Sequence, residues 1–173
     1  MKKVLALLLP LVLCASTAFA FDNYNDDSAV RWKSIDGVIT ALNVDNPVGN
    51  IHSGTFPWHV RSGHASVNLS TGATSFEVEG LVINGAVFSG TPGPISAVTG
   101  TLVCNAGDQT QTVLDTPAVS LSAHGDARFS GSIAGVPASC GNPIFLIRIA
   151  TPAGAAGLWI ATGSERFIGD DRK

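Results

Sequence analysis

The stretch that decides the fold is Ala65-Ser66-Val67-Asn68-Leu69-Ser70-Thr71-Gly72-Ala73-Thr74-Ser75-Phe76-Glu77-Val78-Glu79. Apolar and polar residues alternate on both sides of Thr71-Gly72, and a period of two is typical of a strand with one buried and one wet face. Thr71-Gly72 separates the two runs as a turn signal. The sequence therefore predicts an antiparallel β-hairpin here.

Further short apolar runs fill the rest of the chain and are separated by Gly, Pro, Asn and Ser. The predicted strands cover residues 29–35, 37–44, 96–104, 110–114, 119–123, 127–133, 143–151 and 157–163. We expect a turn at His124-Gly125-Asp126 and a return at 152–156 that pairs 145–149 with 158–160. About 8 to 10 short strands in one domain predict an all-β fold, an antiparallel β-sandwich or a small β-barrel.

Two predicted strands are apolar on both faces, Ile144-Phe145-Leu146-Ile147 and Leu158-Trp159-Ile160-Ala161. Such runs are typical of central strands that are covered from both sides. Arg148 is a charge within the first of them, and a lone buried cation is costly. We expect Arg148 to have a structural role, paired with a carboxylate such as Glu165 or with backbone carbonyls.

The N-terminus has the pattern of a secretory signal peptide. Lys2 and Lys3 precede an apolar run at 4–13, and Ala18-Phe19-Ala20 ends the segment with small residues. We expect residues 1–20 to be a cleaved signal peptide of bacterial type, followed by a flexible polar leader at 21–28, a β-domain at 29–167 and a charged tail at 168–173. The protein is then expected to be secreted, periplasmic or at the cell surface.

The cysteines support an oxidising compartment. Cys14 leaves with the predicted signal peptide, so Cys104 and Cys140 remain. An even pair in an exported chain predicts a disulfide, which would stabilise the fold by about 3 to 4 kcal/mol in the chain-entropy model. A lipid anchor at Cys14 and a reactive thiol at Cys140 are the alternatives.

Charge limits the partners that the chain could bind. The chain has ten Lys and Arg residues against thirteen Asp and Glu residues, and Lys2 and Lys3 leave with the signal peptide. Nucleic acid is not expected as a partner, because phosphate backbones require clustered positive charge. The strands are mostly short and lack the aromatic girdles of lipid-facing strands, so we expect no membrane span in the mature chain.

The densest group of side chains with chemical potential lies at 51–64. An exposed aromatic and polar surface there could stack on a sugar ring or anchor a protein partner. The candidate binding residues are Phe56, Trp58, His59, Arg61 and His64. The weak metal candidates are His52, His59 and His64, whose spacing fits neither one strand face nor one helix face, so we expect no metal site and no cofactor.

Catalytic motifs are not evident. Glu77 and Glu79 share the polar face of an amphipathic strand, where a solvated pair is expected rather than a glycosidase dyad. The acidic group at 22–27 lacks the glycine and the distal glutamate of a calcium loop, and a hydrated leader is the expected alternative. The sequence leans against an enzyme but leaves open a serine triad assembled from distant residues.

One family resemblance concerns residues 63–102. The segment resembles the CHRD type of secreted β-domain in its Gly-x-Ala-x-Val start at Gly63 and in its Ser89-Gly90-Thr91-Pro92-Gly93-Pro94 turn. The His-x-His element of that family is missing, so no residue role is carried over.

Together these features predict an exported, non-enzymatic β-domain that acts as a structural, adhesive or assembly protein. Short side chains and few charges suit strand faces and edges that pair with another subunit, either the protein itself or another surface protein. A carbohydrate-binding module that uses the residues around Trp58 is the first alternative. A secreted hydrolase with an unrecognised site is the second.

Overall fold

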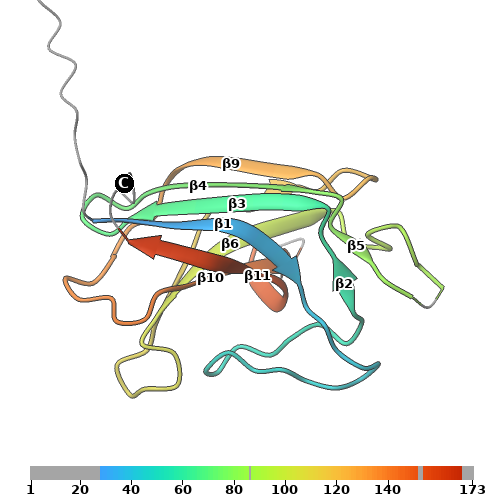
Figure 1. The fold of residues 1–173 in the computed structure, drawn as a ribbon, viewed down its shortest axis with the longest axis horizontal. Coiled ribbons are helices and arrows are strands. Elements are labelled where there is room, and N and C mark those ends of the chain that lie inside the picture. Colours follow the sequence, from blue (N-terminus) through green and yellow to red (C-terminus); the bar gives the residue numbers. More distant parts are fainter. Residues whose placement is uncertain (1–27, 86, 152–153, 169–173) are drawn as a thin grey trace, which may run out of the picture.

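The computed structural model describes residues 28–85, 87–151 and 154–168 (Figure 1). The predicted signal peptide, residues 21–27 of the predicted leader and residues 169–173 of the predicted tail lie outside the described residues. In the described part of the chain, no helix has the length and apolar character needed to cross a bilayer.

The described residues form eleven strands, which confirms the all-β prediction. They are β1 (Ala29–Gly37), β2 (Trp58–His59), β3 (Ser62–Asn68), β4 (Ala73–Glu79), β5 (Val82–Ile83), β6 (Ala97–Cys104), β7 (Thr112–Asp115), β8 (Val119–Ser120), β9 (Ala127–Ser132), β10 (Ile144–Ala150) and β11 (Ala156–Ile168).

Nine of these strands form one antiparallel sheet in the order β7-β6-β10-β11-β1-β3-β4-β9, with β8 also paired to β6. The remaining two, β2 and β5, form a small separate sheet. The large sheet curls into a half-barrel, so that β6 and β10 lie behind β3 and β4 (Figure 1). The result is a single barrel-like domain, in agreement with the predicted fold class.

The inner face of the curled sheet holds the core. Trp32 on β1, Phe76 on β4 and Phe145 on β10 meet there, with ring centroids 5.5 Å apart for Trp32 and Phe145 and 5.9 Å apart for Phe76 and Phe145. All three side chains are at most 2% exposed. Aromatic rings contribute a large apolar area and favour tilted contacts of this kind, so they hold the two halves of the sheet together.

Both predicted hairpins are confirmed. β3 pairs with β4 across the turn at Thr71-Gly72, with Ala65 opposite Phe76. β10 pairs with β11, and Phe145, Leu146, Ile147, Ile160 and Ala161 are fully buried, as expected of central strands. Leu158 is 39% exposed, so the prediction that both faces are covered is wrong at this position. The predicted turn around Gly125 is present, but β8 and β9 then pair with different strands, β6 and β4.

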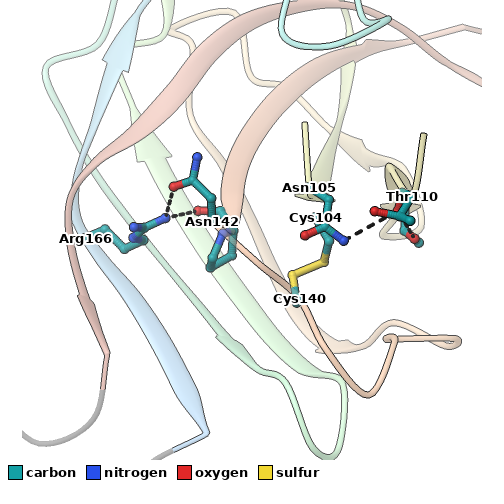
Figure 2. The surroundings of a disulfide bond; sticks show 8 residues. Cys104, Asn105, Thr110, Cys140, Asn142 and Arg166 are labelled. Carbon is teal, nitrogen blue, oxygen red and sulfur yellow. Dashed lines mark hydrogen bonds between the residues drawn. A yellow bond between two sulfur atoms is a disulfide. The ribbon is translucent and has the colours of Figure 1, made fainter. Parts of the chain in front are cut away.

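The predicted disulfide is also confirmed. Cys104 at the end of β6 is bonded to Cys140, which precedes β10 (Figure 2). The same loop is held from its other side by Arg166 on β11, which donates to the side-chain oxygen of Asn142 at 3.0 Å and to the carbonyl of Pro143 at 2.8 Å. The bond rules out a reactive thiol at Cys140, because both sulfurs are used.

The prediction of a strand at 37–44 is wrong. After Gly37 the chain leaves the large sheet, and the Thr40 hydroxyl donates to the carbonyls of Ala41 and Val44 within its own turn. Asn43 adopts a left-handed backbone with φ of 65°, which a strand does not accommodate. The alternation in this segment therefore reflects a surface loop and not a buried face.

Arg148 has the structural role that was expected, but with a different carboxylate. Its guanidinium donates to the carbonyls of Gly157 at 2.7 Å and Ala156 at 2.9 Å. The carboxylate beside it is Asp115 on β7 at 3.3 Å. The expectation of Glu165 is wrong, because β7 and not the far part of β11 lies next to this side chain.

Candidate functional site, an apolar pocket

An open pocket of about 160 Å³ lies at the end of the domain where β1 ends and β2 and β5 lie. Three segments enclose it: the loop that leads into β2, the loop that follows β5, and the β10–β11 hairpin. The lining residues are Gly54, Thr55, Phe56, Trp58, Ile83, Phe88, Pro94, Ile95, Ile149 and Leu158. Carbon atoms dominate this lining, so the pocket suits an apolar group.

Backbone hydrogen bonds hold the three segments in place. Gly54 donates to the carbonyl of Trp159 at 2.7 Å, and Trp159 donates to the carbonyl of His52 at 3.0 Å. On the other wall, Trp58 is the register partner of Ile83 in the β2–β5 pair. The pocket is therefore built by main-chain pairing, which gives it a fixed shape.

Gly54 allows this close packing. A β-carbon at Gly54 would lie 3.1 Å from Cγ2 of Ile160 and 3.5 Å from Nε1 of Trp58. Its backbone can approach β11 closely because it has no side chain. A larger residue at position 54 would push the loop away from β11 and widen the pocket.

The predicted binding residues separate into two groups. Phe56 and Trp58 line the pocket, and Trp58 is only 5% exposed, so the expectation that Trp58 belongs to an exposed aromatic surface is wrong. Strand alternation turns His59 outward, away from Trp58. Arg61 is paired with Glu79 at 3.2 Å, and His64 lies opposite Glu77 on the outer face of β3.

Six large hydrophobic side chains of the described residues are exposed, and we call them the apolar rim: Ile39, Leu42, Val44, Val87, Phe88 and Leu158. Phe88 and Leu158 line the pocket, and the other four lie on the loops that follow β1 and β5. The loops after β1 and after β5 occupy the same end of the domain (Figure 1).

Of the lining residues, only Phe56 and Trp58 were predicted as binding residues from the sequence. Ile83, Phe88 and Ile95 come from residues 82–95 and Leu158 from β11, and only folding brings them to Phe56. The one local signal is that residues 82–95 contain several apolar residues and no charge.

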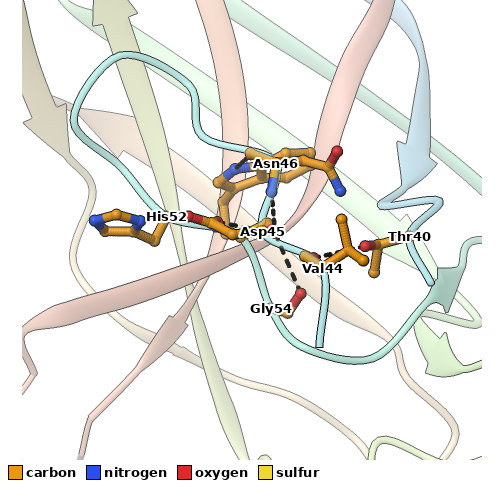
Figure 3. A network of polar contacts seen from close by, with 8 residues as sticks. Thr40, Val44, Asp45, Asn46, His52 and Gly54 are labelled. Atoms are coloured by element: carbon orange, nitrogen blue, oxygen red, sulfur yellow. Dashed lines mark hydrogen bonds and ion pairs between the residues drawn. The ribbon is translucent and has the colours of Figure 1, made fainter. Parts of the chain in front are cut away.

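A polar network braces the loop that carries the pocket (Figure 3). His52 Nδ1 lies 2.6 Å from Asp45 Oδ2, and the Ser53 amide donates to Asp45 Oδ1 at 2.9 Å. The hydrogen bond with His52, and then that from Ser53, lower the pKa of Asp45 below its ordinary value. Trp159 Nε1 adds a bond to the carbonyl of Asn46 at 2.8 Å.

This network contains Asp, His and Ser but does not have the geometry of a triad. The hydroxyl of Ser53 donates to the carbonyl of Gly54 at 3.2 Å and accepts from the amide of Asn46 at 2.9 Å. Ser53 is 3% exposed. Nucleophilic catalysis requires the hydroxyl to bond the imidazole and to reach a substrate. The contacts of Ser53 instead hold the loop together.

The metal candidates do not converge. His52 lies in the loop before β2, His59 on β2 and His64 on β3. Within residues 28–85, 87–151 and 154–168, no group of three or more His, Cys, Asp and Glu side chains is close enough to hold a metal ion.

The glutamates of β4 form ion pairs on the outer face of the sheet. Glu77 pairs with Arg128 at 2.5 Å, and Glu79 pairs with Arg61 and accepts from the Ser62 hydroxyl at 2.9 Å. The Ser62 and Arg61 contacts lower the pKa of Glu79. The Glu79 carboxylate is therefore held in the charged form by its neighbours, whereas an acid catalyst needs a raised pKa.

Among the pockets of the described residues, this one is distinguished by its mainly apolar lining. No known protein family, curated protein or solved structure matches this chain.

Proposed function

We propose that this chain is an exported, non-enzymatic β-domain that acts as a structural, adhesive or assembly protein outside the cytoplasm. It attaches to a protein partner by taking one apolar side chain of that partner into the pocket beside Phe56 and Leu158. The observation that carries the proposal is an open apolar pocket whose lining includes the exposed side chains of Phe88 and Leu158.

The size of the pocket favours a side chain over a free small molecule. Its volume is about 160 Å³, and a cavity of roughly 150 Å³ holds one benzene ring. Sites for small-molecule ligands are commonly about 300 to 1,000 Å³. One aromatic or branched aliphatic side chain therefore fills the space, as an anchor residue does in a protein interface.

The apolar rim gives the partner a surface to cover around that anchor. Ile39 is 91% exposed on the loop after β1, and Val87 is 85% exposed on the loop after β5. Exposed apolar side chains that gather at one place on a globular domain are typical of an interaction site. Covering them removes apolar area from water at about 25 cal/mol per Å².

The carbohydrate alternative has less support. A sugar ring stacks on an open aromatic face and needs polar groups around it. The ring of Trp58 is buried, and His59 and Arg61 do not line the pocket. Carbohydrate binding stays a prediction, and a glucoside is therefore one of the two ligands in the experiment.

The experiment is an NMR titration of the exported protein with two model ligands, N-acetylphenylalaninamide and methyl β-glucoside. We expect the phenylalanine amide to shift the Trp58 indole and the Leu158 methyl signals at millimolar concentration, and the glucoside to leave them unchanged. Leu158→Asp places a charge at the pocket mouth and should abolish the shifts. Ala118→Asp, at an exposed alanine outside the pocket lining, is the matched control.

Shifts with the glucoside instead of the amide would favour the carbohydrate alternative. Absence of any response to the amide would contradict the proposed function.

A further inference from the structure

The chain itself contains a side chain with the chemistry that the pocket accepts. Residues 21–27, outside the described residues, read Phe21-Asp-Asn-Tyr24-Asn-Asp-Asp27, and Tyr24 is the one tyrosine of the chain. A tyrosine has an apolar ring that can be buried and a hydroxyl that can stay in water at the rim. A ring of this size matches the pocket volume given above.

The leader joins the domain far from the pocket. It enters β1 at Ala29, whereas the pocket lies beyond the other end of β1 (Figure 1). At that end Gly37 lies against β2, since a β-carbon at Gly37 would be 2.2 Å from the Trp58 carbonyl oxygen. A nine-residue strand spans about 26 Å at 3.3 Å per residue.

Tyr24 cannot cover that distance within its own molecule. It is five residues from Ala29, where β1 begins. Five fully extended residues span about 18 Å at most. Only another copy of the chain can present Tyr24 to the pocket.

We infer that Tyr24 of one copy docks in the apolar pocket of a second copy. This inference rests on the proposed function, because it names the partner that fills the same pocket. The leader joins the domain at the start of β1, and the pocket lies beyond the other end of that strand. Each contact therefore joins the leader of one copy to the pocket end of the next copy. Such a head-to-tail contact is heterologous and generates open chains or rings rather than closed pairs.

The test is a mixing experiment followed by sedimentation velocity, with protein recovered after export of the full chain. Tyr24→Ala keeps the pocket but loses the anchor, and Leu158→Asp keeps the anchor but loses the pocket. We expect wild type to associate with increasing concentration, and each variant alone to weaken association by about 30-fold or more. An equimolar mixture of the two variants has one intact interface, so it should form dimers and no larger species.

Two controls separate loss of the anchor from other effects. Tyr24→Phe keeps the ring and should retain association, and Ala118→Asp should behave as wild type. Circular dichroism of each variant shows whether the fold is intact.

The outcomes distinguish this inference from the proposed function. A strictly monomeric wild type, unchanged association of Tyr24→Ala, or a mixture with no dimer would each overturn the inference. If the phenylalanine amide still binds the pocket in those cases, the proposed function stands with a different partner. If the amide does not bind either, both fail.

Discussion

Gly100 on β6 and Phe76 on β4 touch across the core, on strands from opposite halves of the curled sheet. A β-carbon at Gly100 would lie 2.8 Å from Cδ1 and Cε1 of Phe76 and 2.8 Å from Cζ of Phe145. The backbone of β6 therefore lies directly on the aromatic cluster, and the sheet can curl this tightly because position 100 has no side chain.

Gly100→Ala should destabilise the protein by about 1 to 3 kcal/mol, because a methyl group there forces the aromatic rings to shift in a close-packed core. Gly157→Ala on β11 is the matched control, since its β-carbon would have one near neighbour, the Ile149 carbonyl at 3.3 Å. Urea unfolding measures both. Equal stability of the two variants would contradict the packing described here.

Reduction of the Cys104–Cys140 disulfide should lower the unfolding free energy by about 3 to 4 kcal/mol, because the bond closes a long loop in the unfolded chain. The variant with both cysteines replaced by serine should match reduced wild type in denaturant unfolding. If a reductant left the stability of wild type unchanged, the disulfide would not contribute as stated.

Asp126 makes stability depend on pH in the acid range. Its carboxylate accepts from the Gly80 amide at 3.0 Å and from the Ser122 hydroxyl at 3.2 Å, and the Gly80 bond is the main cause of its lowered pKa. A pKa below the ordinary 3.8 stabilises the fold above that pH, and the stabilisation is lost as pH falls through the folded-state value. Asp126→Asn should lower stability at neutral pH and flatten its decline below pH 3.8. Thermal unfolding across this range checks it, and parallel curves for the two proteins would refute it.

Arg148→Met should cost about 1 to 3 kcal/mol for each buried carbonyl left without a donor. The carbonyls concerned are those of Ala156 and Gly157. Asp115→Asn should cost less than 1 kcal/mol, because its side chain is 40% exposed and such ion pairs contribute little. Chemical denaturation measures the loss of unfolding free energy in each variant. A larger loss for Asp115→Asn than for Arg148→Met would contradict the view that the carbonyl contacts of Arg148 matter more than its ion pair.

The hairpins and the central strands could be predicted because their signal is local. Alternation around Thr71-Gly72 indicates a two-faced strand pair, and the continuous apolar run at 144–147 indicates a strand buried on both sides. The segment at 37–44 has a comparable pattern but was predicted wrongly. Whether such a segment joins a sheet depends on where its backbone bonds go, and here the Val44 amide donates to the carbonyl of Ala41 within the loop.

The pocket could be predicted only in part, because it exists only through contacts between distant segments. Phe56 and Trp58 were predicted as binding residues because they are aromatic residues in a polar stretch, and both line the pocket. Their neighbours Ile95 and Leu158 look like ordinary strand residues in the sequence. Trp58 was expected on the surface as part of an aromatic and polar patch, but alternation in β2 turns its side chain inward.

The most direct test is an isotope-filtered NOE measurement on a mixture of ¹³C-methyl-labelled and unlabelled copies of the exported protein. We expect NOEs between the Leu158 methyl protons of labelled copies and tyrosine ring protons of unlabelled copies. The ring protons can come only from Tyr24, the one tyrosine of the chain. Leu158 methyl signals without any intermolecular NOE, at concentrations where the protein associates, would contradict this expectation.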